Sequence, residues 1–538
     1  MSLVRFRVWA PLLKLLLKAA FLFFGDFKMS KKNKVFMPLS DAVSEFASDD
    51  RISFHVPGHK GNGNEGGAAA GIFEKNILKC DLTELPGLDD LHHSSGVIRQ
   101  AEQEAAVLFG SDETFFLANG TTSGAAAAIA AVSSEKTNVI LERSIHGCAT
   151  TGLIISGASP YYIYDHYDSE KNLSGGISAD DVKRSLELCE NPSAVFVTHP
   201  SYYGTYSSLS EIVDAAHCAG VPVIADEAHG AQMMFTGQRI ISAMEAGADI
   251  SVQSTHKMLG SLTQSSMLHV QGNLVDRKRL KFFINMMTST SPSYLLMSSL
   301  DAARADADRN GSEKWHKIRT LVSDAADRID RIPGMRCCRE FTGADGLKHD
   351  TEGSRLLVTA CDLGLSGRDL EKILSEKYRI DAEFSDIRYA ILLAGAGSRE
   401  SDFDMLTAAL SDISAHYSDK APEPFHRFSR QMEMYDSLFK LRMSAELTPR
   451  QAVFSDYSIL DSEKSEGRIS ACDISVYPPG IPAVRAGELL SRDIINYIVE
   501  CSKLGFEFHG PAYYDIFGNV KFCCVEDERD DMMLMGYF

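Results

Sequence analysis

Between residues 110 and 253, short apolar runs alternate with helical stretches, and this alternation constrains the fold more than any other feature. The runs predicted as strands are Glu113–Ala118, Asn138–Leu141, Tyr161–Tyr164, Ala194–Thr198, Val221–Ala225 and Ile250–Gln253. The helices between them include Ser123–Val132, which is rich in alanine, and Leu209–Ala219, which ends at Gly220. Strands separated by helices of about 10–15 residues are typical of βαβ units. The sequence therefore predicts an α/β fold with a mostly parallel sheet.

The length and composition limit the classes of protein to which the chain can belong. A chain of 538 residues is too long for one hydrophobic core and should form two or three domains. Its content of 44% hydrophobic and 24% charged residues is that of an ordinary globular protein. The formal charge of 54 − 73 = −19 disfavours nucleic acid as a partner and suits cationic ligands.

Two features bear on the cellular location. The first 28 residues contain an apolar run, Val8–Phe24, which Lys14 and Lys18 interrupt. Because a secretory signal or a membrane span needs an uninterrupted apolar stretch, we expect residues 1–28 to be an extension outside the folded core. A surface-lying amphipathic helix is the alternative. The 11 scattered cysteines lack zinc-ligand spacing, which predicts a reduced cytoplasmic chain without a metal.

Two charged residues follow the ends of predicted strands. Lys257 comes just after Ile250–Gln253, at the edge where open α/β sheets bind ligands. Desolvation there would lower the pKa of its amine, and only a neutral amine is a nucleophile. Asp226 ends the preceding apolar strand and could accept a hydrogen bond from a protonated ring nitrogen. Taken alone, Lys257 is better explained as a solvated loop lysine, and Asp226 is as readily explained as a metal ligand or a cap.

Two further features precede these residues in the chain. Thr121, Thr122 and Ser123 open the alanine-rich helix, where hydroxyls and backbone N–H groups can bind a phosphate. His146 follows the strand Asn138–Leu141 and offers a ring that could stack on a flat cofactor. Four features thus occur in the order expected for the binding site of one cofactor. They are the hydroxyls that can bind a phosphate, the ring of His146, the carboxylate of Asp226 and the amine of Lys257.

At this point the chain resembles a known family, the bacterial ornithine/lysine/arginine decarboxylases of pyridoxal-phosphate (PLP) fold type I. The most specific match is the segment 254–269, which reads Ser-Thr-His-Lys-Met-Leu-Gly-Ser-Leu-Thr-Gln-Ser-Ser-Met-Leu-His. Supporting matches are 55–61, 81–84, 88–92, 226–231, 477–482 and 487–488. The resemblance covers roughly residues 35–530. The chain keeps the Asp-Asp-Leu-His motif of the family at residues 89–92 but differs from the family just after it, within the segment 92–96. The resemblance therefore does not predict which residues of this loop contact the substrate.

The resemblance implies a cofactor, pyridoxal 5'-phosphate, and a role for each matching residue. Lys257 would hold PLP as a Schiff base, Asp226 would contact the pyridinium nitrogen, and His146 would stack on the ring. The residues implied to contact the phosphate or orient the cofactor are Thr121, Thr122, Ser254 and His256. His229 would lie near the 3-hydroxyl of the cofactor.

The resemblance also implies a domain plan with a seven-stranded mixed sheet in the large domain. The expected segments are an arm at 29–60, a large PLP-binding domain at 61–315, a small α/β domain at 316–416 and a C-terminal decarboxylase domain at 425–538. The chain looks like a short form without the N-terminal wing of the large family members. We therefore expect a homodimer or tetramer with its active site at the subunit boundary, and no stable association with membranes.

The implied reaction is decarboxylation of arginine, lysine or ornithine to an amine and CO2, with Lys257 or His256 returning a proton. An acidic group should bind the distal cation of the substrate. The candidates are Glu488 and Asp473 in the C-terminal domain and Glu84 or Asp89 from a neighbouring subunit. Another fold-type I reaction, such as transamination or aldol-type cleavage, and a catalytically silent regulator are the alternatives. A silent homologue would tend to lose the lysine or the aspartate, and both are present.

Overall fold

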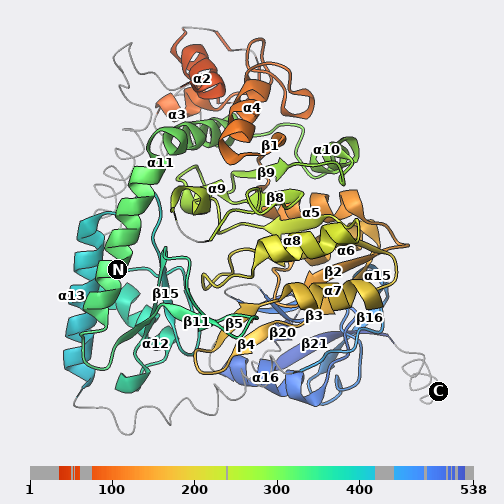
Figure 1. Cartoon of the computed structure of the whole chain (residues 1–538), viewed down its shortest axis with the longest axis vertical. Helices are drawn as coiled ribbons and strands as arrows, with labels where there is room; N and C mark the ends of the chain where they lie inside the picture. Colours follow the sequence, from red (N-terminus) through yellow and green to blue (C-terminus); the bar gives the residue numbers. More distant parts are fainter. Residues whose placement is uncertain are drawn as a thin grey trace. The chain divides into compact units, whose positions relative to one another are not determined.

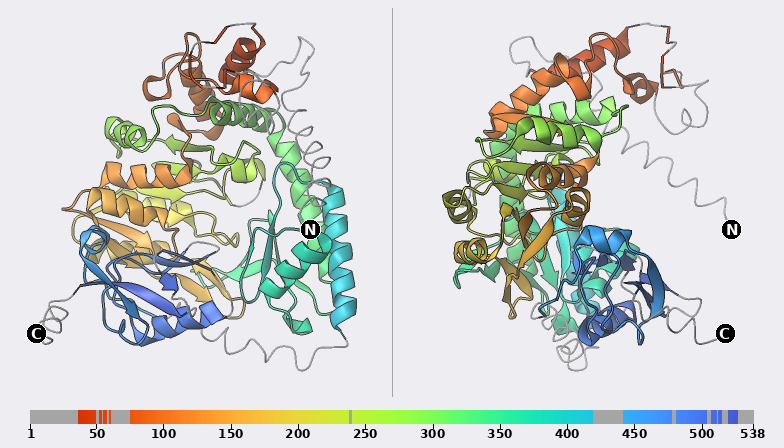
Figure 2. Two further views of the ribbon diagram at one scale, coloured as in Figure 1. Left: turned by 180° about the vertical axis from the view of Figure 1, so that it is seen from behind. Right: turned by 90° about the vertical axis from the view of Figure 1, so that its right-hand side faces the viewer.

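The structure is a computed structural model, and Figures 1 and 2 show it from three sides. It describes residues 36–49, 52–53, 55–57, 59–60, 75–237, 240–418, 441–477, 481–503, 507–510, 512–514 and 519–526. The predicted extension at residues 1–28 lies outside these ranges. Residues 38–538 form one compact unit.

The centre of this unit is a seven-stranded sheet, as predicted (Figure 1). In spatial order its strands are β1 (Glu113–Leu117), β9 (Ser266–Val270), β8 (Ile250–Gln253), β7 (Val223–Asp226), β6 (Pro192–Thr198), β2 (Asn138–Glu142) and β3 (Ser159–Ile163). Strand β9 runs antiparallel to both of its neighbours, and all the other pairs are parallel. The mixed sheet of the predicted fold class is therefore confirmed.

Helices cover both faces of the sheet because successive strand residues point to opposite sides. On one face, Val139 and Leu141 of β2 share a buried cluster with α5, α6 and α10. On the other face, Ile140 belongs to a cluster with α7 and α8. The bounds of these helices are α5 Gly120–Val132, α6 Cys148–Ser156, α7 Ala179–Leu188, α8 Leu209–Cys218 and α10 Arg277–Met286. The uninterrupted apolar strands of the sequence are thus explained by burial on both sides.

A long helix, α11 (Tyr294–Ile329), belongs both to the large domain and to the small one. Its buried residues share one core with the helices of the arm and with the small-domain sheet, and Trp315 is 1% exposed within that core. The predicted boundary between residues 315 and 316 falls inside this helix. An unbroken helix therefore carries the chain from one domain to the next, and the predicted boundary stays a prediction. Figure 2 shows α13 alongside this helix.

The remaining elements complete these two domains. The arm and its surroundings contain α2 (Pro38–Ser48), α3 (Lys75–Cys80), η2 (Leu91–His93) and α4 (Val97–Phe109). A hairpin, β4 (His166–Asp168) with β5 (Leu173–Gly176), and the short helices η3 (Met233–Phe235) and α9 (Thr255–Met258) belong to the large domain. The small domain has the antiparallel sheet β10 (Arg336–Cys338), β13 (Arg355–Thr359), β15 (Ala390–Leu393) and β14 (Phe384–Ser385). Its other elements are β11 (Glu340–Thr342), β12 (Lys348–Asp350), η4 (Cys361–Leu363), α12 (Gly367–Ile373), η5 (Leu374–Tyr378) and α13 (Glu400–Tyr417).

The described part of the C-terminal domain consists of two small sheets and two helices, and it has a separate core. One sheet contains β16 (Tyr457–Asp461), β21 (Val520–Val525) and β20 (Ala512–Tyr514). The other contains β18 (Pro482–Val484), β17 (Ile474–Tyr477) and β19 (Glu507–His509), and the helices are α15 (Pro449–Phe454) and α16 (Arg492–Lys503). Among the described helices, none is both long enough and apolar enough to span a bilayer.

Candidate active site

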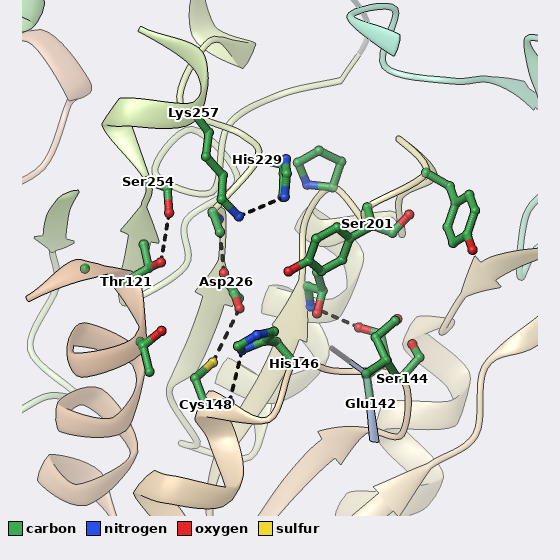
Figure 3. Close-up of a pocket in the computed structure, with 18 of the residues that line it drawn as sticks. Thr121, Glu142, Ser144, His146, Cys148, Ser201, Asp226, His229, Ser254 and Lys257 are labelled. Carbon is green, nitrogen blue, oxygen red and sulfur yellow. Dashed lines mark hydrogen bonds between the residues drawn. The ribbon is translucent and has the colours of Figure 1, made fainter. Parts of the chain in front are cut away.

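A pocket of about 320 Å³ lies at the carboxyl edge of the central sheet (Figure 3). Nine residues were predicted to bind the cofactor, and eight of them line this pocket. They are Thr121, Thr122, His146, Asp226, His229, Ser254, His256 and Lys257. The structure therefore brings together side chains that are up to 136 residues apart in the sequence, since 257 − 121 = 136. Their individual roles stay a prediction.

Lys257 projects into the pocket from α9, the short helix that follows β8. Its Nζ lies 2.9 Å from Nε2 of His229 and 5.4 Å from the centre of the Tyr202 ring. Burial lowers the pKa of the Lys257 amine, while the carboxylates of Asp226 and Glu383 oppose this effect. The pocket therefore increases the neutral, nucleophilic fraction of the amine at a given pH.

Asp226 is 5% exposed at the end of β7, and its two oxygens have different donors. The backbone N–H of Ala228 donates to Oδ1 at 3.0 Å, and the thiol of Cys148 donates weakly to Oδ2 at 3.9 Å. Close to it, Nδ1 of His146 accepts the backbone N–H of Cys148 at 3.1 Å. This hydrogen bond fixes the His146 ring, and burial lowers its pKa, so the ring is neutral at pH 7.

The predicted phosphate cup is formed where α5 meets α9. Oγ1 of Thr121 and Oγ of Ser254 are 2.8 Å apart, so the two hydroxyls face the same space. The prediction for Ser123 is wrong, because its hydroxyl donates to the Gly120 carbonyl at 2.8 Å and the residue does not line the pocket. A Cβ on Gly124 would lie 2.5 Å from Leu117 and 2.7 Å from Val252, so glycine lets α5 approach the sheet closely.

Two more histidines complete the wall around Lys257. The Nδ1–H of His256 donates to the Ser265 carbonyl at 2.7 Å, which leaves its Nε2 without a proton when the ring is neutral. His229 is 3% exposed, and its ring centre lies 4.7 Å from that of Tyr202. Burial and the charges of Lys257 and Arg355 hold the pKa of His229 well below its usual value. Its ring is therefore neutral, and its Nε2 can accept a hydrogen bond from the Lys257 amine.

The residues of this pocket fit the predicted cofactor. PLP requires donors for a phosphate, an amine for its aldehyde, a carboxylate for its ring nitrogen and a polar partner for its 3-hydroxyl. Thr121, Ser254, Lys257 and Asp226 supply the first three of these. Nδ1 of His229 is buried and, among the described residues, has no hydrogen-bond partner. Because an orphaned buried polar atom is costly, it indicates a ligand group that is to be bound there.

The C-terminal domain secures the loop that carries His146. Arg485 is 1% exposed and donates to the carbonyls of Arg143 and Ile145 at 3.0 and 2.7 Å. The Nη1 of Arg485 also donates to Thr150 on α6 at 3.0 Å. These residues flank His146 on both sides, so the orientation of the His146 ring depends on the C-terminal domain. Arg485 is 485 − 146 = 339 residues away from His146 in the sequence.

Glu488 and Asp473, predicted to bind the substrate cation, serve the same domain contact instead. Glu488 is 1% exposed and accepts from Arg143 at 2.9 Å and from the backbone of Arg485 at 2.7 Å. Asp473 accepts from Thr150 at 2.6 Å and from the Ala486 N–H at 2.9 Å. Neither residue lines the pocket. The prediction of a substrate contact is wrong for both within this chain, because both carboxylates lie in the domain contact and neither reaches the pocket.

Glu84 and Asp89 also lie outside the pocket of their own chain. Glu84 accepts the hydroxyl of Thr83. Asp89 accepts backbone N–H groups at the start of α4, including those of Gly96 at 2.7 Å and Ile98 at 3.1 Å. These donors make Asp89 a cap at the start of α4, and its predicted contact with a neighbouring subunit stays a prediction. A contact of Glu84 with a neighbouring subunit stays a prediction.

Replacing Asp89 with alanine should therefore lower stability and leave the chemistry intact. The loss of a helix cap should reduce the free energy of unfolding by about 1 kcal/mol at pH 7. Backbone donors hold the pKa of Asp89 below its usual value, so its stabilising effect is present above the unfolded-state pKa. The part of the difference that comes from the carboxylate should disappear as the pH falls through the lower folded-state pKa, which leaves only the cost of alanine at the positive φ of this position. Urea unfolding at several pH values measures it, and a pH-independent difference would contradict the cap.

Two acidic residues near the pocket were not predicted. Glu142 ends β2, lines the pocket and accepts the Thr198 N–H at 2.9 Å. Burial and the nearby Asp165 carboxyl raise its pKa well above the usual value. Glu383, exposed just before β14, raises the pKa of Lys257. The end of the strand before His146 was a signal for Glu142, whereas Glu383 carries no motif in the sequence.

Comparison with known proteins agrees with this geometry. Residues 37–347 match the model of the Orn/Lys/Arg decarboxylase major domain, and residues 428–519 match that of the C-terminal domain of the same family. The pocket and the mixed sheet are thus those of an amino acid decarboxylase. The chain belongs to the Orn/Lys/Arg decarboxylase family and is a carboxy-lyase.

Individual relatives refine this placement. The chain is 34% identical over 474 residues to an arginine decarboxylase of Bacillus subtilis, covering 88% of this chain and 95% of that protein. It is 22% identical to the inducible lysine decarboxylase of Escherichia coli, covering 89% and 79% respectively. Among solved structures, the lysine decarboxylase LdcF of Francisella novicida superposes with a TM-score of 0.80 at 19% identity, covering 92% and 82%. The last similarity shows that the fold is that of fold type I decarboxylases.

Proposed function

We propose that this protein decarboxylates a basic L-amino acid with PLP as its cofactor, and that arginine is the first substrate to test. The observation that carries the proposal is the placement of the Lys257 amine, the Asp226 carboxylate and the Thr121–Ser254 hydroxyl pair around one pocket. Support for arginine comes from relatives named arginine decarboxylase, which are 34–35% identical over nearly their whole length. The lysine decarboxylases among the relatives are 22–23% identical.

Each residue of the pocket has a role in the proposed decarboxylation. When bound, the cofactor supplies an electron sink that accepts the electron pair released with CO2. Asp226 would keep the ring nitrogen protonated, and His146 would lie against the flat face of the ring. His229 would hold the Lys257 amine in place by accepting a hydrogen bond at Nε2, and burial of the amine would raise its neutral fraction. Lys257 and His256 both remain candidates for returning a proton to the substrate carbon.

Glu383 is our proposed partner for the distal cation of the substrate. It is exposed, and its charge reaches both Lys257 and His256. The Glu383 N–H donates to the Ile391 carbonyl at 2.9 Å, which fixes its backbone beside β14. A substrate bound through its amine near Lys257 would extend away from the sheet toward the small domain, where an exposed carboxylate can meet an ammonium or guanidinium group.

The assay that tests the proposed function compares three substrates. The PLP-loaded protein should release CO2 from arginine and form agmatine, with lower kcat/KM for lysine and ornithine. If the protein forms cadaverine or putrescine faster than agmatine, its substrate is lysine or ornithine and not arginine. Formation of a keto acid without CO2 would overturn the proposal.

Glu383→Gln should raise KM for the preferred substrate about tenfold to a hundredfold, with a smaller change in kcat. The reason is that a hydrogen bond to a charged group contributes about 1.5–3 kcal/mol. The matched control is Glu376→Gln, which removes an exposed carboxylate from the same domain and should leave KM unchanged. An unchanged KM in Glu383→Gln would exclude this residue as the cation partner.

We further propose a cytoplasmic homodimer or tetramer that acts in polyamine biosynthesis. All 11 cysteines are free thiols, which supports a reducing compartment. The predicted location of the active site at a subunit boundary is tested by mixing two inactive variants. Activity restored by mixed dimers would support a shared site, whereas light scattering that finds only monomers would contradict it.

A further inference from the structure

A chain of buried polar side chains crosses the central sheet beside the candidate active site. All of its members are at most 1% exposed, and none of them lines the pocket. They are Thr114, Glu227, Ser251, Gln253 and His269. Ile250 and Val252 alternate with two of these residues and pack against α5 and α6, so the polar chain lies on the other face of the sheet. No step of the proposed reaction uses this chain.

Glu227 is the acceptor at one end of the polar chain. Its Oε1 accepts the backbone N–H of Ala243 at 2.7 Å. Its Oε2 accepts the amide of Gln253 at 3.0 Å and also the hydroxyl of Ser251. All three donors are neutral groups. Burial raises the pKa of Glu227 to about 7, and the exposed carboxylate of Glu245 adds to this effect. Both the ionised and the neutral form of Glu227 are therefore accessible near neutral pH.

The polar chain has one defined direction while Glu227 is ionised. A carboxylate only accepts hydrogen bonds, so the amide of Gln253 turns its N–H2 group to Glu227 and its oxygen to His269. Nε2 of His269 lies 3.2 Å from this oxygen and therefore carries the ring proton. Nδ1 of His269 is left to accept the hydroxyl of Thr114 at 2.8 Å. Burial lowers the pKa of His269 to about 3, so the ring is neutral and has this single tautomer.

The bond between Gln253 and Glu227 joins the two strand ends that carry the candidate catalytic residues. The backbone ladder of β7 and β8 reaches as far as the Glu227 N–H, which donates to the Val252 carbonyl at 3.0 Å. Asp226 lies at the end of β7, and β8 continues past Gln253 into α9, which carries Lys257. The side-chain bond thus holds the two strands together at the point where both lead to the pocket.

We propose that Glu227 is a positioning residue for the proposed decarboxylation. Its ionised carboxylate acts through Gln253 and sets the distance between the Asp226 carboxylate and the Lys257 amine. A displacement of a reacting group by about 1 Å is enough to lower a rate by about a hundredfold. The structural mark of the ionised state is the Nε2–H tautomer of His269. The effect on the rate rests on the proposed function, whereas the direction of the hydrogen bonds does not.

Glu227→Gln tests the direction of the polar chain. The oxygen of the new amide still accepts the Ala243 N–H, so its N–H2 group faces that of Gln253. Gln253 then has to turn over and present an N–H to His269, which moves the ring proton from Nε2 to Nδ1. Nitrogen NMR of isotope-labelled histidine should show the Nε2–H tautomer in the wild type well above pH 7 and the Nδ1–H tautomer in the variant. His269→Gln assigns the signal, and an unchanged tautomer in Glu227→Gln would overturn the directed chain.

The rates of the PLP-loaded protein test the positioning role. In Glu227→Gln, kcat should fall about tenfold to a hundredfold with KM nearly unchanged, because the reacting groups are displaced and the substrate contacts stay. Gln253→Met breaks the same bond at similar side-chain size and should lower kcat in the same range. The control, Glu211→Gln, removes an exposed carboxylate from α8 and should match the wild type. Wild-type kcat in both Glu227→Gln and Gln253→Met would refute the positioning role, whereas a wild type that releases no CO2 would refute the proposed function.

The pH dependence separates the charge of Glu227 from its shape. The charged or titratable groups around it are Glu245, Asp226 and His269, and Glu227→Gln retains all three. The ratio of kcat in the wild type to kcat in this variant therefore reports on Glu227 itself. This ratio should be largest above pH 7, where the carboxylate is ionised, and should fall below pH 7, where the carboxyl group is neutral like the amide. A ratio that stays constant with pH would show that the charge of Glu227 does not position the strand ends.

Discussion

Replacement of Lys257 with alanine should reduce CO2 release by at least about 10⁴-fold, because the variant lacks the amine that attacks the cofactor aldehyde. This factor corresponds to about 5.5 kcal/mol of transition-state stabilisation. The visible absorbance of the cofactor joined to the protein should disappear as well. No described neighbour can replace the amine, since the groups within 3 Å are limited to the neutral ring of His229.

The matched control for this variant is Lys183→Ala. Lys183 is exposed on α7, where it pairs with Asp180 at 3.0 Å, and its loss should leave rate and spectrum unchanged. Both variants should keep the thermal midpoint of the wild type within a few degrees, because neither replaced side chain packs in the core. Residual activity above about 1% in Lys257→Ala, or a retained visible band, would show that another amine binds the cofactor.

The sheet could be predicted because its strands are buried on both faces. Such strands appear as uninterrupted apolar runs, and all six predicted runs correspond to strands of the central sheet. Strand β9 was not predicted as a strand, since its residues were noticed only as part of a family motif. The continuity of α11 was also missed. Its apolar positions contact two different domains in turn, so no single stripe marks it as one helix.

Residues that bind the cofactor were easier to predict than those that bind the substrate. The predicted cofactor contacts follow strand ends in an order that matches a known family, so order and resemblance together pointed to Asp226 and Lys257, which the structure places in one pocket. The substrate carboxylates carry no such constraint, and Glu488 has the same charge in a buried ion pair as it would have in a binding site. Position also does not distinguish Asp226 from the adjacent Glu227, which faces away and accepts from Gln253 at 3.0 Å. The structure is needed to distinguish a carboxylate in the pocket from one in a buried ion pair or hydrogen-bond network.

Asp226→Asn should give the second large effect, a fall in kcat of about 10³-fold with the cofactor still bound. The amide keeps the size of the side chain and can still accept the Ala228 N–H, so the fold should be unchanged. An amide lacks the negative charge that would keep the ring nitrogen protonated, and without that proton the ring is a poor acceptor of electrons.

The contrast with Lys257→Ala separates binding from chemistry. Asp226→Asn retains the lysine, so the visible absorbance of the joined cofactor should persist while CO2 release falls. Asp226→Glu restores the charge on a longer side chain, so it should recover part of the lost rate. Asp112→Asn, which removes an exposed carboxylate that pairs with Arg277, serves as the control and should match the wild type. A rate in Asp226→Asn within tenfold of the wild type would mean that this carboxylate does not face the ring nitrogen, and the orientation of the cofactor in the pocket would have to be reversed.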